Sequence, residues 1–166
     1  MATTYEPIST TTLGSAASSI TFSSISSAYT DLKLVMTYTS AGAIYSYLLF
    51  NNDTGANYSD TYLVGDGSVA FSGSDTSQGF IAFGSYQSPA SSTAPCFATA
   101  DVFSYAGSTY KTALITSSND KNGSGDVERI VGLWRSTSAI NRIDIKSSST
   151  AFAAGTTATL YGIKSA

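Results

Sequence analysis

The sequence predicts an all-β fold, namely a two-sheet antiparallel β-sandwich with the jelly roll as the expected topology. Short stretches in which apolar and polar residues alternate recur from Ile20 onward, separated by clusters of Gly, Ser, Asn and Asp. No stretch of about 11 or more residues shows the 3.6-residue period of an amphipathic helix. A chain of 166 residues is long enough for one such core. We therefore expect a single β-sandwich domain over residues 20–166.

The alternating stretches give about eight to ten strands, at spacings typical of a sandwich. In the stretch 31–39, the apolar residues Leu32, Leu34 and Met36 share one face. In the stretch 142–146, Ile143 and Ile145 should point inward while Asp144 points outward. The strands that we expect lie at residues 31–39, 44–50, 61–65, 80–84, 96–105, 110–117, 127–135, 142–146 and 156–164.

Residues 1–19 predict an extended N-terminal arm. They form a polar string rich in Thr and Ser, a composition that disfavours a helix. Because this segment contains too few apolar groups to fold alone, we expect it to be stabilised by lying across a neighbouring molecule. Four isolated residues could anchor it on that partner: Tyr5, Pro7, Ile8 and Leu13.

Composition argues against most catalytic and cofactor chemistry. The chain has no His, which removes the commonest general base, and its one cysteine, Cys96, can form neither an intrachain disulfide nor an all-cysteine zinc site. We expect no enzyme activity and no cofactor, with Cys96 as a small core residue. Net charge is −3 and the few basic residues are scattered, which disfavours nucleic acid as a partner. No apolar run reaches the ~20 residues of a membrane span, and no secretion signal is visible.

Two polar loops are candidate ligand sites. In FNNDTGANYSDTY (residues 50–62), Asn52, Asp53, Tyr58 and Asp60 carry oxygen atoms that could hold a sugar hydroxyl or a weakly bound Ca²⁺. The same stretch is also typical of a turn leading into a strand, and we favour the turn. In SSNDKNGSGDVE, the pair Asn122-Gly123 predicts a hairpin turn better than an EF-hand, whose first and last positions are not matched.

Tyrosines offer a possible carbohydrate-stacking surface, because sugar rings pack on aromatic faces. Tyrosine is also common at sheet faces and subunit interfaces, and packing is the role that we favour for most of them. We likewise expect Trp134 in the core or in an interface. The tyrosines considered are Tyr38, Tyr45, Tyr47, Tyr58, Tyr62, Tyr86, Tyr105 and Tyr110.

Three stretches resemble small structural proteins of tailed bacteriophages, particularly marine and cyanobacterial ones. They are residues 1–25 (MATTYEPISTTTLGSAASSITFSSI), 50–68 (FNNDTGANYSDTYLVGDGS) and 152–166 (FAAGTTATLYGIKSA). The resemblance spans most of the chain and contains no catalytic motif. It implies a virion component that is assembled in the cytoplasm of the bacterial host.

The resemblance leaves open the position on the virion. Our first hypothesis is a capsid decoration (cement) protein, a homotrimer that contacts the major capsid protein or other virion proteins through its arm. The alternative is a tail-fibre or tail-tip module that recognises host carbohydrate, using residues such as Asp53, Tyr58 and Asp60. A polysaccharide-degrading enzyme is the least favoured hypothesis.

Overall fold

The computed structural model describes residues 4–42, 44–84 and 90–164. Within these ranges the chain forms strands and turns, and no helix is long and apolar enough to cross a membrane. The strands are β1 (Tyr5–Thr12), β2 (Ser19–Phe22), β3 (Asp31–Tyr38), β4 (Ser46–Phe50), β5 (Tyr58–Gly65), β6 (Ala70–Gln78), β7 (Ile81–Gly84), β8 (Cys96–Phe103), β9 (Lys111–Asn119), β10 (Asp126–Trp134), β11 (Ile143–Ser147) and β12 (Thr157–Ile163).

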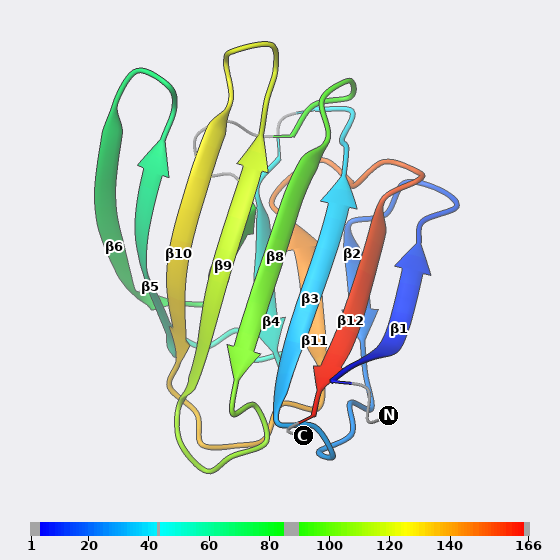
Figure 1. Cartoon of the computed structure of the whole chain (residues 1–166), viewed down its shortest axis with the longest axis vertical. Helices are drawn as coiled ribbons and strands as arrows, with labels where there is room; N and C mark the ends of the chain where they lie inside the picture. Colours follow the sequence, from blue (N-terminus) through cyan, green and yellow to red (C-terminus); the bar gives the residue numbers. More distant parts are fainter. Residues whose placement is uncertain (1–3, 43, 85–89, 165–166) are drawn as a thin grey trace.

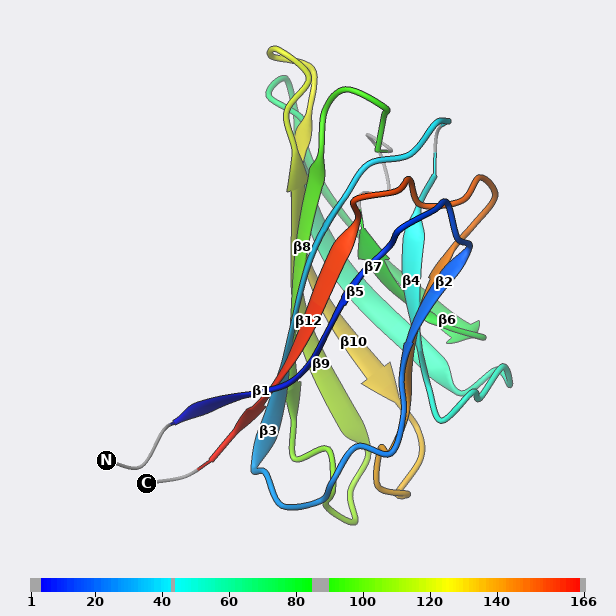
Figure 2. The same ribbon diagram turned by 90° about the vertical axis from the view of Figure 1, so that its right-hand side faces the viewer.

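The strands form two antiparallel sheets that pack face to face (Figure 1 and Figure 2). The larger sheet has eight strands in the order β1-β12-β3-β8-β9-β10-β5-β6, and the smaller has four in the order β2-β11-β4-β7. Early strands pair with late ones in reverse order, as β1 with β12, β2 with β11 and β5 with β10. This is the arrangement of a long hairpin rolled into two layers, so the prediction of a jelly-roll-like β-sandwich is confirmed.

The core lies between the sheets, where the inward-facing residues of both layers meet. The predicted faces are confirmed: Leu32, Leu34 and Met36 of β3 are buried, as are Ile143 and Ile145 of β11. Cys96 and Trp134 are also buried, as the sequence predicted. Alternation of period two therefore locates the core in this fold, because each strand turns one face inward.

The predicted N-terminal arm is extended, but much of it pairs with its own chain. Residues 5–12 form β1, the edge strand of the larger sheet, and pair with β12. The hydroxyls of Thr10 and Thr159 lie 3.0 Å apart, and those of Thr12 and Thr157 lie 3.1 Å apart. Main-chain pairing needs few apolar side chains, so a Thr-rich segment can join a sheet edge that hydrophobicity alone does not indicate.

The four predicted anchor residues of the arm differ in their contacts. Ile8 and Leu13 are half-buried and pack against the core of their own sandwich, and the Leu13 N–H donates to the carbonyl of Thr156 at 2.9 Å. Tyr5 and Pro7 are exposed. The segment 5–12 is thus part of the described sandwich, whereas the sequence predicted a boundary between residues 19 and 20.

The two sheets approach each other closely where β10 crosses β7. Gly132 of β10 faces Ile81 of β7, and a Cβ atom on Gly132 would lie 2.4 Å from Cγ2 of Ile81. Ile81 is fully buried. The missing side chain at position 132 therefore sets the depth at which β7 lies on the larger sheet.

Candidate functional site

The polar loop after β4 is held by contacts within the fold. The carboxylate of Asp53 accepts hydrogen bonds from Trp134 Nε1 at 2.7 Å, Asn57 Nδ2 at 3.0 Å and the Gly55 N–H at 2.8 Å. Burial alone would raise the pKa of Asp53, but these three donors hold it below its ordinary value. Asp53 thus fixes the turn and ties it to β10.

The other three predicted ligand residues of this loop do not gather on one surface. Tyr58 is buried, and its hydroxyl accepts from the Phe50 N–H at 3.0 Å, while its ring stacks on Trp134 with centroids 6.2 Å apart. Asp60 points into the interior, and Asn52 is exposed, with a positive φ of 56°. The polar groups of Asp53 and Tyr58 therefore form hydrogen bonds within the fold. Binding of a ligand at this loop stays a prediction.

Asp60 connects the two sheets. Its Oδ2 accepts a hydrogen bond from the N–H of Ala82 at 3.3 Å, which satisfies a donor on the outer edge of β7. Oδ1 of Asp60 has no hydrogen-bond partner in the described part of the chain. Burial, together with the nearby charge of Asp75, raises the pKa of Asp60. This carboxyl group positions β7, whose residue Ala82 lines the cleft described next.

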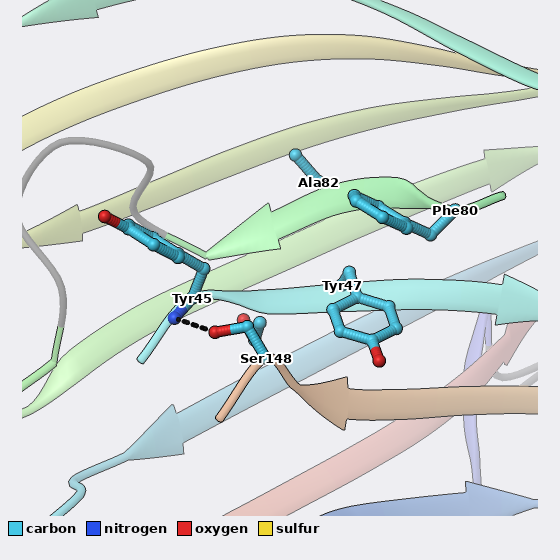
Figure 3. A pocket seen from close by; sticks show the side chains of 6 residues that line it. Tyr45, Tyr47, Phe80, Ala82 and Ser148 are labelled. Atoms are coloured by element: carbon cyan, nitrogen blue, oxygen red, sulfur yellow. Dashed lines mark hydrogen bonds between the residues drawn. The ribbon is translucent and has the colours of Figure 1, made fainter. Parts of the chain in front are cut away.

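A cleft of about 370 Å³ lies on the outer face of the four-stranded sheet (Figure 3). Leu48 and Ile81 point into the core, so their neighbours Tyr47, Phe80 and Ala82 face away from it. Tyr47 is paired with Ala82 of β7 in the sheet register. The residues that line the cleft are Tyr45, Ser46, Tyr47, Phe80, Ala82 and Ser148.

Aromatic rings form two sides of this cleft. Tyr47 and Phe80 pack together, with ring centroids 4.7 Å apart, and Tyr45 lies across from them with 43% of its surface exposed. Ser148 supplies a polar group between the aromatic sides: its Oγ accepts a hydrogen bond from the Tyr45 N–H at 3.1 Å. The volume is near the lower end of the ~300–1,000 Å³ typical of small-molecule sites.

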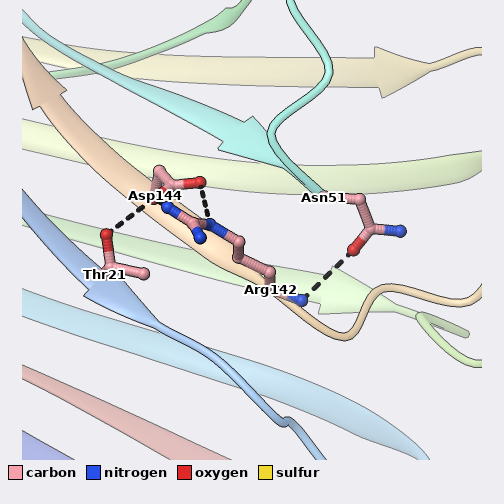
Figure 4. A network of polar contacts seen from close by, with 4 residues as sticks. All are labelled: Thr21, Asn51, Arg142 and Asp144. Atoms are coloured by element: carbon pink, nitrogen blue, oxygen red, sulfur yellow. Dashed lines mark hydrogen bonds and ion pairs between the residues drawn. The ribbon is translucent and has the colours of Figure 1, made fainter.

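A charged network lies on the same face, one strand away (Figure 4). Arg142 donates to Asp144 twice, from Nε at 2.8 Å and from Nη2 at 2.7 Å, and the Thr21 hydroxyl donates to the same carboxylate at 2.6 Å. Asp144 points outward as predicted, yet its side chain is only 1% exposed because these partners cover it. Burial alone would raise the pKa of Asp144, but the hydrogen bonds and the positive charges of Arg142 and Lys146 lower it.

The network also joins the turn after β4 to β11. Oδ1 of Asn51 accepts hydrogen bonds from the N–H groups of Asn141 at 2.9 Å and Arg142 at 3.2 Å, and Nδ2 of Asn51 donates to the Ala139 carbonyl at 2.8 Å. Three hydrogen bonds of one side chain therefore tie the turn after β4 to the segment that leads into β11.

The remaining predicted tyrosines divide into buried and exposed groups. Tyr38 and Tyr105 are fully buried, and burial raises the pKa of both hydroxyls. Tyr62 is half-buried, Tyr110 is exposed outside the cleft, and Tyr86 lies outside the described residues.

Sequence reasoning found only part of the cleft. Of the predicted tyrosines, the structure brings Tyr45 and Tyr47 together there. Phe80 and Ser148 were missed, because no local pattern in the sequence shows that their segments flank β4.

The second polar loop forms the predicted hairpin. Asn122 and Gly123 both have positive φ, 63° and 88°, in the turn between β9 and β10. Asp120 caps the turn by accepting from the Gly123 N–H at 2.8 Å. Among residues 4–42, 44–84 and 90–164, no three acidic or Cys side chains are grouped as metal ligands would be.

Comparison with known proteins gives no family. No protein-family model matches the chain, and no curated protein matches it in sequence. An exo-inulinase from Aspergillus awamori is similar in structure, with 15% sequence identity and a TM-score of 0.49; the similar region covers 96% of this chain and 29% of the inulinase chain. Galectin LEC-6 from Caenorhabditis elegans has 10% identity and a TM-score of 0.36, over 94% of this chain and 96% of the galectin. These distant likenesses concern the fold alone.

Proposed function

We propose that the protein is a non-enzymatic carbohydrate-binding protein of the bacteriophage virion that acts in host recognition. The observation that carries this proposal is the aromatic cleft formed by Tyr45, Tyr47 and Phe80 on the outer face of the smaller sheet. The resemblance of the sequence to phage structural proteins supports the virion as its location.

The cleft has the two components that sugar recognition needs. The C–H face of a pyranose ring packs favourably on an aromatic ring, and the Tyr47–Phe80 pair presents such a surface. Hydroxyl groups of a sugar need polar partners at the edge of the ring, and Ser148 and the tyrosine hydroxyls supply them. Because Tyr47 and Ala82 belong to paired strands, the site would bind with little rearrangement.

Direct titration tests this function. Glucose, galactose and mannose, each with its uronic acid and its 6-sulfate, are titrated into the purified protein by calorimetry. We expect saturable binding of at least one sugar and a loss of up to roughly tenfold in affinity for Tyr47→Ala and for Phe80→Ala, in line with ~0.5–1.5 kcal/mol for aromatic packing. Tyr110→Ala removes an exposed tyrosine outside the cleft and serves as the matched control. Absence of binding at millimolar sugar, or equal binding by all variants, would refute the proposal.

Capsid decoration is a second candidate, supported by the outer face of the larger sheet. Leu63 of β5 and Val127 and Val131 of β10 are exposed on adjacent strands of that sheet. Exposed apolar side chains that lie near one another are typical of protein contacts. In this function the protein would be a homotrimer seated on the major capsid protein.

Electron microscopy with a gold-labelled antibody separates the two candidates. Label over the head would support decoration. The purified protein should then also decorate bare capsids, and the Val131→Asp variant should not. Label confined to the tail tip or fibres would support host recognition. Thr112→Asp, on the same face of the neighbouring strand β9, introduces the same charge and is the matched control.

A further inference from the structure

We infer that the cleft selects saccharides with an anionic substituent, a carboxylate or a sulfate ester, and that Lys146 recognises this group. The inference rests on the proposed carbohydrate-binding function and specifies its ligand class. It follows from the register of β4 and β11, which places Lys146 directly opposite Tyr47. Partners in an antiparallel pair project their side chains from the same face, so the lysine stands beside the aromatic wall of the cleft.

The positive charge of Lys146 helps to lower the pKa of Asp144, but the two side chains form no salt bridge. In the described ranges, the side chain of Lys146 forms no hydrogen bond or salt bridge with another residue. The carboxylate of Asp144, two residues away on the same face, already accepts two hydrogen bonds from Arg142 and one from Thr21. Its negative charge is therefore balanced by Arg142, and the positive charge of Lys146 stays in excess at this face.

None of the described residues that line the cleft is acidic. They are aromatic, serine and alanine residues. Arg142, whose side chain is 41% exposed, adds donors that Asp144 does not use. In a chain with net charge −3, a face with excess positive charge is a local feature that overall composition does not explain. A sugar packed on Tyr47 would direct one edge toward Lys146, where an anionic group gains a charge-assisted hydrogen bond.

The test compares each neutral hexose with its uronic acid and its 6-sulfate. We expect at least one of the two charged forms to bind roughly fivefold or more tightly than the neutral sugar at low salt, since hydrogen bonds to charged groups are the stronger ones. Whether the carboxylate or the sulfate gains more identifies the natural substituent. The preference should shrink as ionic strength rises, because salt screens an exposed charge.

Variants locate the effect. Lys146→Gln should abolish the preference while neutral sugar binds as before. Lys33→Gln makes the same change of net charge on the larger sheet, where Lys33 is paired with Asp101, and should retain the preference. Equal affinity for neutral and charged forms, or a preference that survives Lys146→Gln, overturns this inference and leaves carbohydrate binding intact. Failure of every sugar to bind overturns both.

Discussion

Substitution of Gly132 by alanine tests how the two sheets pack. The new Cβ would lie 2.4 Å from Cγ2 of Ile81, 2.9 Å from Cδ1 and 3.1 Å from Cγ1. Carbon atoms pack best at about 3.5–4.0 Å, so the closest contact is short by more than about 1 Å. Ile81 is fully buried, and β7 is paired with β4, so neither the side chain nor the strand can move without loss of packing.

The expected cost follows from two opposing effects. Overpacking a well-packed core costs about 1–3 kcal/mol. Alanine in a strand gains back about 0.5–1 kcal/mol relative to glycine. A contact as short as 2.4 Å places the overpacking cost in the upper half of that range, so the net loss for Gly132→Ala is about 1–2.5 kcal/mol in the free energy of unfolding. For a domain of this size, that corresponds to a fall of about 2–10 °C in Tm.

Urea unfolding followed by the fluorescence of Trp134, the single tryptophan, measures this loss. Ile81→Ala removes all three clashing atoms, so Gly132→Ala should be neutral or stabilising in that background. Gly65→Ala is the control, because a Cβ there meets no atom within 4 Å. If Gly132→Ala has the same free energy of unfolding as the wild type, the predicted clash is absent. The same holds if Gly132→Ala lowers the free energy of unfolding as much in the Ile81→Ala background as in the wild type.

Two further predictions concern Asp53 and Cys96. The pKa of Asp53 is lowered in the folded state, so its carboxylate stabilises the fold above its ordinary pKa of ~3.9, and that contribution is lost as pH falls through the folded value. Asp53→Asn should therefore lower Tm at pH 7, and the difference in Tm between wild type and variant should be smaller at pH 3. The same difference at both pH values would show that the charge of Asp53 is not the cause of the stabilisation. Cys96 is buried, and burial raises the pKa of its thiol, so Ellman's reagent should label it in urea and leave it unmodified in the native protein. Rapid labelling of the folded protein would contradict this.

The central strands could be predicted from the sequence, whereas of the four edge strands only β7 was predicted, at residues 80–84. β3 is buried on one face and alternates cleanly, so Leu32, Leu34 and Met36 identify it. β1 and β6 occupy the two edges of the larger sheet and contain few buried side chains. Their main-chain pairing leaves little trace in hydrophobicity. The order of the strands could not be predicted from the sequence either, because pairs such as β1 with β12 join opposite ends of the chain.

Only part of the candidate site could be predicted, because the pairing of strands that are distant in the sequence brings its residues together. Tyr45 and Tyr47 belong to the tyrosine set that the sequence identified as possible sugar ligands. Phe80 and Lys146 join them only through the pairing of β4 with β7 and with β11. In the loop after β4, the polar residues marked a turn correctly, but Trp134, which donates to Asp53, lies far along the chain.

The hydroxyl pairs between β1 and β12 have a consequence for the response of the protein to salt. Contacts such as Thr10–Thr159 carry no net charge, and only 11% of the residues are charged. Added salt screens ions and leaves neutral hydrogen bonds nearly unchanged. A high salt concentration should therefore release the acidic glycan that we propose beside Lys146 while the sandwich stays folded. Attachment to that glycan would then be reversible through a change in ionic strength.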